Sequence, residues 1–257
     1  MIVIAHLSDI HIDAGGGRAE RRSTARTRAV MEYLEQLPYD LDAVLVTGDI
    51  ADHATPEEYA RARKLLTSRH PVLSCPGNHD ARRPFREGLL GEAPSDGPVN
   101  QTLETDRFVI ALCDSSVPGE HHGLLEDETL AWLDEVLTRA PREVPVLVGF
   151  HHPPVTVQSD YTDSIRQIGE DRLAAVAERH PHLLAFLCGH VHAPAATTFA
   201  GRPLLIAPGV VSTLRLPWEN GPGRTSAVLE EVPPGLLFHV IDDEGRLTTH
   251  YRPVVVA

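Results

Sequence analysis

The chain has 257 residues, of which 42% are hydrophobic and 23% are charged. This apolar fraction excludes a disordered chain, and the length is ample for a buried core without disulfide or metal support. With 36 acidic and 23 basic residues the formal charge is -13, which argues against a broad nucleic-acid-binding surface. An anionic substrate would therefore need a local positive centre, such as a metal site.

The early part of the chain alternates short apolar runs with helical patterns. Strands are expected at residues 2–7, 43–46, 72–75, 108–113, 144–150 and 183–188, and helices at residues 23–37, 56–68, 126–137 and 170–179. The second helix has the clearest start, because Thr55 is a favoured cap and Pro56 suits the first helical position. Strands separated by helices at this spacing indicate βαβ units.

Beyond residue 195 the helical patterns cease and short strands remain. These strands are expected at residues 197–200, 203–207, 227–232, 236–241 and 247–253. Two polar stretches rich in Pro and Gly, residues 82–98 and 154–169, are expected to be long surface loops, which often carry function. We expect one domain over residues 1–257, with a motif-bearing core over about residues 3–210 and C-terminal strands over about residues 227–253.

The cysteines and the N-terminus bear on the cellular compartment. Cys75, Cys113 and Cys188 are far apart and lie in apolar runs, which predicts reduced core residues rather than disulfides or a thiolate metal site. No apolar run approaches the ~18 residues of a membrane helix, and the chain opens on an apolar run without a basic segment or cleavage site. We therefore expect a cytoplasmic protein without a membrane span.

Side chains that bind metal ions follow five of the predicted strands. In chain order the seven candidate ligands are Asp9, His11, Asp49, Asn78, His151, His190 and His192, and His79 directly follows Asn78. One such residue alone is more often a helix cap or a hydrogen-bonded core residue. Open α/β sheets, however, place their ligand site at the carboxyl ends of the strands, and oxygen and imidazole groups coordinate hard or borderline cations. The ensemble therefore predicts a site for two cations that share a carboxylate.

In this order the motifs resemble those of the calcineurin-like metallophosphoesterases: Asp-x-His, Gly-Asp, Gly-Asn-His-Asp, His, and Gly-His-x-His. Residues 46–52, 76–82, 114–119 and 151–154 are also similar to class III cyclic nucleotide phosphodiesterases and to related bacterial glycerophosphodiesterases. The resemblance implies an α/β fold, a four-layer αββα sandwich of two mixed sheets flanked by helices. It also implies a homo-oligomer.

The resemblance further implies two divalent or mixed-valence metal ions (Fe, Mn or Zn) and a role for each motif residue. One metal would take Asp9, His11, Asp49 and His192, and the second would take Asp49, Asn78, His151 and His190. His79 resembles the catalytic histidine, and Asn78 and His79 would contact the substrate. Two cations ~3.5–4 Å apart stabilise the attacking and leaving oxygens of an in-line displacement, and they lower the pKa of a bound water so that hydroxide forms near neutral pH.

We therefore expect a metal-dependent phosphoric diester hydrolase that acts on a small molecule. A 3′,5′-cyclic nucleotide such as cAMP is the favoured substrate, and a glycerophosphodiester or another small phosphodiester is the alternative. A non-catalytic scaffold of the same fold is a further alternative, whereas a polymeric nucleic acid is not expected as a partner.

For several residues near the motifs, two interpretations remain open. His152 and His53 could contact the substrate or be ordinary polar residues, and Asp80 could support the site or cap a turn. The arginines that follow the first motif, Arg18, Arg21, Arg22, Arg26 and Arg28, are interpreted as a solvated helix face, with steering of phosphate as the alternative.

Overall fold

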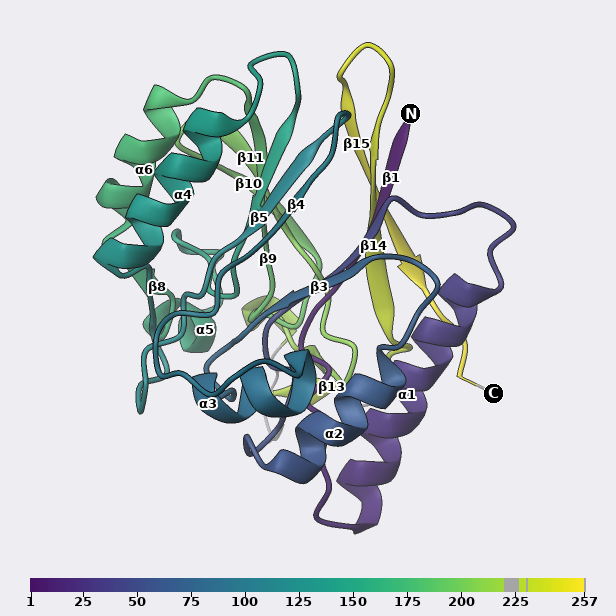
Figure 1. Cartoon of the computed structure of the whole chain (residues 1–257). Coiled ribbons are helices and arrows are strands. Elements are labelled where there is room, and N and C mark those ends of the chain that lie inside the picture. Colours follow the sequence, from purple (N-terminus) through teal and green to yellow (C-terminus); the bar gives the residue numbers. More distant parts are fainter. Residues whose placement is uncertain (220–226, 230, 257) are drawn as a thin grey trace.

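The computed structural model describes residues 1–219, 227–229 and 231–256. Two mixed β-sheets lie face to face, and helices cover the outer face of each sheet (Figure 1). This arrangement confirms the four-layer αββα sandwich. It also confirms the expected mixture of parallel strands and late antiparallel strands.

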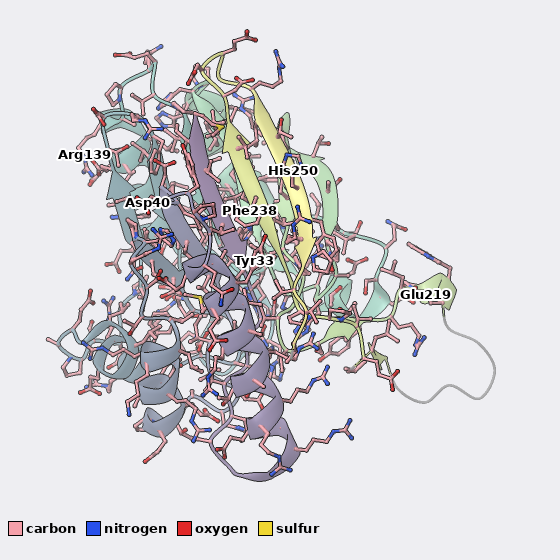
Figure 2. All side chains as sticks on the ribbon, turned by 90° about the vertical axis from the view of Figure 1, so that its right-hand side faces the viewer. Tyr33, Asp40, Arg139, Glu219, Phe238 and His250 are labelled. Carbon is pink, nitrogen blue, oxygen red and sulfur yellow. The ribbon has the colours of Figure 1, made fainter. Side chains whose placement is uncertain are left out.

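The first sheet is parallel at its centre and antiparallel at one edge. Its strands are β1 (Ile2–Leu7), β2 (Ala43–Thr47), β3 (Val72–Cys75), β14 (Gly235–Ile241) and β15 (Leu247–Pro253), in the order β15-β14-β1-β2-β3. β1, β2 and β3 are mutually parallel, whereas β14 and β15 are antiparallel to their neighbours. Helices α1 (Gly17–Glu35) and α2 (Pro56–Leu65) pack on the outer face. Figure 2 shows this side, where Tyr33 of α1 lies beside Phe238 of β14.

The second sheet has four parallel strands between two antiparallel edges. Its strands are β4 (Gln101–Glu104), β5 (Val109–Leu112), β7 (Val146–Gly149), β9 (Leu183–Cys188), β10 (Ala195–Phe199) and β11 (Arg202–Ile206), in the order β10-β11-β9-β7-β5-β4. Helices α4 (Asp127–Arg139) and α6 (Glu170–Arg179) pack on its outer face. Between the sheets, fully buried side chains of both sheets meet, among them Ile4, Leu45, Ile110 and Leu187. Burial on both faces explains the nearly continuous apolar runs of the central strands.

Shorter elements connect these layers. They are α3 (Arg82–Pro84), the π-helix η1 (Phe85–Leu90), α5 (Asp160–Ser164), the 3₁₀-helix η2 (Pro217–Glu219), and the two-stranded pairs β6 (Gly123–Leu124) with β8 (Gln167–Ile168) and β12 (Thr213–Leu214) with β13 (Val228–Leu229). The strand expected at residues 227–232 is therefore seen only as β13, and residue 230 lies outside the described residues.

Both stretches expected to be surface loops contain regular structure, so that expectation was wrong in part. Residues 82–98 begin with α3 and η1, because Phe85 and Leu89 are one helical turn apart and both are buried. The Phe85 ring packs on Tyr59 of α2, with the ring centroids 5.7 Å apart. Residues 154–169 contain α5 and β8. These elements are short, and the polar, Pro-containing composition of the two stretches predicts loops instead.

The two helices over the first sheet differ in how well their starts were predicted. α2 begins at Pro56 as expected, because Thr55 and Glu58 form a reciprocal capping box. α1 begins at Gly17 rather than at residue 23, because its N-cap residue, Gly16, has no side chain that could accept a backbone N–H and so gives no start signal in the sequence. Cys75, Cys113 and Cys188 are free and buried, as predicted. Within the described residues, no helix has both the length and the apolar composition needed to cross a membrane.

Candidate metal centre

The candidate ligands lie where five parallel strands end. β1, β2 and β3 of one sheet and β7 and β9 of the other bring their carboxyl ends to the same edge of the sandwich. Five of the seven candidate ligands have a positive φ: Asp9 (54°), His11 (40°), Asp49 (49°), His190 (69°) and His192 (55°). A left-handed backbone is unfavourable for residues other than glycine, and such strain concentrates at functional sites.

A first cluster joins residues that follow β1, β2 and β9. Asp9, His11, Asp49 and His192 each offer one ligand atom, and these atoms lie within 4.8 Å of one another. The His11 Nε2 atom lies 3.4 Å from Asp49 Oδ2, and His192 Nε2 lies 3.3 Å from Asp9 Oδ1. The structure therefore brings together the four residues expected at one metal.

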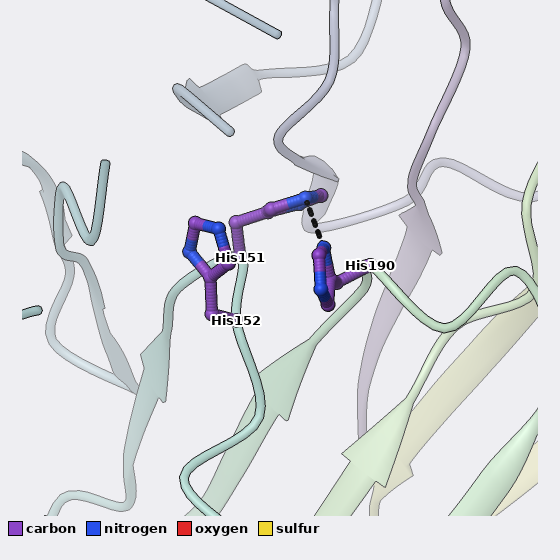
Figure 3. Close-up of side chains that lie close together, drawn as sticks. All are labelled: His151, His152 and His190. Carbon is purple, nitrogen blue, oxygen red and sulfur yellow. Dashed lines mark hydrogen bonds between the residues drawn. The ribbon is translucent and has the colours of Figure 1, made fainter. Parts of the chain in front are cut away.

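A second cluster contains His151, His152 and His190, all of them buried. His190 Nδ1 lies 3.2 Å from His151 Nε2, the contact drawn as a dashed line in Figure 3. His151 Nε2 also lies 3.3 Å from Asp49 Oδ2. One carboxylate oxygen of Asp49 is thus close to His11 of the first cluster and to His151 of the second.

Asn78 and His79 follow β3 and lie at the same edge of the sandwich as the two clusters. Asn78 Oδ1 is buried and has no hydrogen-bond partner among the described residues, so it is an acceptor that a cation would satisfy. The His79 backbone N–H donates to Asp49 Oδ1 over 2.9 Å, which leaves Oδ2 facing the two clusters. The His79 ring donates from Nδ1 to the Asp52 carbonyl oxygen over 2.9 Å, and its side chain is 38% exposed. His79 therefore lies beside the clusters and reaches solvent.

The ring nitrogens that face the clusters fit a cation. At three of the rings the Nδ1 atom is held by the protein: His11 by Asp52 Oδ1 (2.9 Å), His151 by the Thr47 carbonyl oxygen (2.7 Å) and His192 by Ser212 Oγ (3.0 Å). A neutral imidazole that donates from Nδ1 presents a lone pair at Nε2. His11 Nε2 lies only 3.3 Å from His192 Nε2, so two lone pairs and two carboxylates converge on one place. Such a donor set repels itself unless it holds positive charge.

The pKa values of the clustered Asp and His side chains also indicate a place that favours positive charge. Burial alone would raise the pKa of Asp9 and Asp49, but His192 beside Asp9 and His151 beside Asp49 hold both values below the usual range. Burial lowers the pKa of His190 to about 3, so this ring is neutral near pH 7. Burial also opposes the charged form of His151, yet Asp49 and Asp9 raise its pKa to about 9. Asp9 and Asp49 therefore stay ionised near neutral pH and draw positive charge to this place, which the proton of His151 supplies here.

Sequence analysis missed several residues that orient these ligands. Asp52 holds His11 and, through its carbonyl oxygen, His79, and Ser212 holds His192. The Asp52 carboxylate follows Asp49 by three residues, which is the only signal the sequence offers, and Ser212 carries none. Ser115 Oγ lies 2.9 Å from Nδ1 of His152, which is therefore a buried, hydrogen-bonded polar residue.

His53 lies at the rim of the site. Its backbone N–H donates to Glu58 Oε2 and its ring Nδ1 to Glu58 Oε1, both over 3.0 Å, while 63% of the side chain is exposed. The hydrogen bond to Glu58 is the main reason that the pKa of His53 is raised, with the Asp52 charge adding to it.

Asp80 supports the site rather than merely capping a turn. Its buried carboxylate accepts backbone N–H groups of Ile50, Ala51 and Gly77 and the hydroxyl of Tyr59, over 2.9–3.0 Å. Ile50 and Ala51 follow Asp49, and Gly77 precedes Asn78. Asp80 therefore ties the loop that presents Asp49 to the loop that presents Asn78.

We expect Asp80→Asn to destabilise the protein by about 2–4 kcal/mol and to lower Tm by roughly 5–10 °C, because the amide NH₂ would face backbone N–H donors. Tyr59→Phe removes one of the four donors and the acceptor of the Ala81 N–H, so it should cost about 1–2 kcal/mol. Urea unfolding of both variants measures the difference. Equal small losses would show that Asp80 does not hold the two loops together.

The arginine-rich run of α1 is not a solvated face throughout, so that interpretation was wrong for part of it. Arg26 is buried and donates to the carbonyl oxygens of Val210 and Val232. Arg22 Nε donates to the Val211 carbonyl oxygen over 2.9 Å. The bonds to Val210 and Val211 hold the segment that leads to Ser212, the partner of His192.

Comparisons with known proteins agree with this geometry. Residues 2–194 match the family model described as calcineurin-like phosphoesterase. A probable cyclic nucleotide phosphodiesterase of Rhodococcus erythropolis is 34% identical, over 86% of this chain and 75% of its own length. The glycerophosphodiester phosphodiesterase GpdQ of Enterobacter lignolyticus is 34% identical, over 93% of this chain and 86% of its own length. A crystal structure of a dimetal phosphatase from Danio rerio superposes with a TM-score of 0.63 at 18% identity, covering 100% of this chain and 99% of that one.

Proposed function

The chain belongs to the calcineurin-like phosphoesterase family, and on that premise we propose that it hydrolyses 3′,5′-cyclic nucleotides with the aid of two metal ions. The position of Asp49 carries the proposal, because its Oδ2 atom lies 3.4 Å from His11 Nε2 and 3.3 Å from His151 Nε2. A carboxylate oxygen between two histidine clusters is suited to bridge two cations. The 34% identity to a probable cyclic nucleotide phosphodiesterase supports the choice of substrate.

We assign the ligands as the motifs suggest. One cation would be held by Asp9, His11, Asp49 and His192, and the second by Asp49, Asn78, His151 and His190. The buried, unpartnered Asn78 Oδ1 and the converging ring nitrogens support this assignment. Two cations at these positions would supply Lewis acidity to the phosphoryl oxygens and lower the pKa of the attacking water. A mixed His, Asp and Asn donor set suits Fe, Mn or Zn.

His79 is proposed as the proton donor to the leaving oxygen. Its Nδ1–H is engaged by the Asp52 carbonyl oxygen, which fixes the ring plane and leaves Nε2 to deliver the proton. Its ring meets the His11 ring edge-on with the centroids 4.6 Å apart, so it is adjacent to the first cluster without belonging to it. Asn78 and His79 would both contact the substrate.

A glycerophosphodiester is the second candidate substrate, because a relative named for that activity is equally similar over slightly more of the chain. The alkoxide leaving groups of the two substrate classes require the same acid catalysis, so the proposed machinery serves both.

A hydrolysis panel with defined metals tests the proposed function. The purified protein is stripped of metal, loaded with Mn²⁺, Zn²⁺ or Fe²⁺, and assayed with 3′,5′-cyclic, 2′,3′-cyclic, glycerol and nitrophenyl phosphodiesters. We expect metal-dependent hydrolysis with the highest kcat/KM for a 3′,5′-cyclic nucleotide. Preference for a glycerophosphodiester would establish the second candidate. Failure to bind any of these metals in calorimetry would indicate a scaffold.

A further inference from the structure

A buried serine contacts the turn that carries two histidines of the second cluster. Ser115 follows β5 and lies within residues 114–119, one of the segments similar to class III phosphodiesterases. Its Oγ atom accepts the backbone N–H of His151 over 3.2 Å and that of His152 over 3.3 Å. The same oxygen lies 2.9 Å from His152 Nδ1. One hydroxyl group therefore holds both residues of the turn.

These contacts determine which nitrogen of the His152 ring carries the proton. A hydroxyl group has two acceptor lone pairs and one proton. The two backbone N–H groups use both lone pairs of Ser115 Oγ, so its proton is donated to His152 Nδ1. An imidazole that accepts at Nδ1 carries its own proton at Nε2 and has no second lone pair for a cation.

The His152 ring is also confined by its neighbours. Its centroid lies 4.7 Å from that of His151 and 4.7 Å from that of His190, and Figure 3 shows the three rings together. A Cβ atom at Gly123 would lie 2.5 Å from the His152 ring, so only glycine leaves room for it there. The ring therefore packs against two proposed metal ligands in a fixed position.

Asp114 connects Ser115 to the loop that carries Asn78. The buried Asp114 carboxylate accepts the backbone N–H of Ser116 over 2.8 Å and lies 2.9 Å from Arg82 Nε. Arg82 also donates to the Ser116 carbonyl oxygen over 2.9 Å, and it follows Asn78 by four residues. A buried ion pair thus joins the loop after β3 to the loop after β5.

We propose that Ser115 is a positioning residue for the second metal. It holds the backbone of His151, and it keeps His152 in the Nε2–H form, which packs beside the metal site and does not ligate. The Arg82–Asp114 ion pair keeps this support aligned with the loop of Asn78.

The inference rests on the proposed function, since it concerns the ligands assigned to the second metal. Three residues are assigned to the first metal alone, and none of them has a hydrogen bond to Ser115 in the described part of the chain: Asp9, His11 and His192. Removing the Ser115 hydroxyl should therefore affect the two metals unequally.

Mn²⁺ binding to Ser115→Ala tests the inference, followed by calorimetry and by electron paramagnetic resonance. The wild-type protein should bind two Mn²⁺ ions and give the exchange-coupled signal of a metal pair. Ser115→Ala should raise the Kd of the second Mn²⁺ about 10- to 100-fold, the usual effect of removing a group that orients a ligand. The Kd of the first Mn²⁺ should change less than about threefold, and the spectrum should remain that of an isolated ion.

Two further variants separate positioning from other effects. Leu137→Ala is the control for lost stability, because Leu137 is fully buried in α4, in the outer helix layer. It should lower Tm at least as much as Ser115→Ala and leave both Mn²⁺ affinities unchanged. His152→Asn keeps an acceptor for the Ser115 hydroxyl close to the place of Nδ1, so it should keep the signal of the metal pair.

NMR of the ring nitrogens gives a readout that needs neither metal nor a Ser115 variant. The His152 signals, identified by their absence in His152→Asn, should show the Nε2–H form in the metal-free wild-type protein. A proton on Nδ1 would overturn the inference.

The other outcomes are equally distinct. Wild-type Mn²⁺ affinities in folded Ser115→Ala, or equal weakening of both metals, would overturn the inference and leave the proposed function intact. Loss of the second metal in His152→Asn would make His152 a ligand, and its loss in Leu137→Ala would reduce the role of Ser115 to general stability. A wild-type protein that binds none of Mn²⁺, Zn²⁺ and Fe²⁺ would instead be a failure of the proposed function itself.

Discussion

Asp49→Ala is expected to reduce kcat/KM by at least on the order of 10³-fold, equivalent to about 4 kcal/mol of transition-state stabilisation. The Asp49 carboxylate lies between His11 and His151, so its loss would affect both proposed metal positions at once. It would also leave the His79 backbone N–H without its acceptor. We therefore expect cooperative binding of the two metals to disappear together with activity.

His192→Ala provides the comparison for Asp49→Ala. His192 belongs only to the first cluster, so its replacement should chiefly weaken one metal and leave the second bound. Elemental analysis of both variants, with kcat/KM for bis(4-nitrophenyl) phosphate and a thermal melt of the same preparations, measures the contrast. Two tightly bound metals in a folded Asp49→Ala protein would show that Asp49 does not bridge.

His79→Ala is expected to lower kcat/KM for a cyclic nucleotide by about 10²–10⁴-fold, the usual contribution of a general acid. The loss on bis(4-nitrophenyl) phosphate should be distinctly smaller. A ribose alkoxide needs a proton as its bond to phosphorus breaks, whereas nitrophenolate leaves readily without one. Metal content should stay near that of the wild type, because the His79 side chain is bonded to the Asp52 carbonyl oxygen and is 38% exposed, unlike the buried proposed ligands.

The two ester substrates separate the possible roles of His79. Equal losses on both esters would remove His79 from the acid role and would indicate that it stabilises charge on the phosphate instead. Lost metal in the same preparation would show that the roles of Asn78 and His79 had been wrongly divided. His53→Ala is a suitable control, because His53 is also an exposed histidine near Asp52 but is held by Glu58.

The sequence pattern by itself determined the mixture of parallel and antiparallel strands with helices and the edge at which the chemistry gathers, whereas the four-layer arrangement was an implication of the family resemblance. Strands β1, β3 and β9 and helix α6 have the predicted bounds, because continuous apolar runs and helical periodicity are local properties of the chain. Parallel strands share one carboxyl edge, so motifs that follow successive strands had to meet there. The family resemblance added the ligand assignment, which remains a prediction.

Only the tertiary structure decided how that edge is built. The left-handed backbone at Asp9 and His190 is unfavourable for an isolated chain, and it persists because packing and hydrogen bonds between distant segments enforce it. Ser212 contacts His192, and Arg22 contacts the Val211 carbonyl oxygen, across elements that are separate in the chain. Residue type and spacing do not predict such pairings. The pairings depend on which faces of the elements the fold brings together.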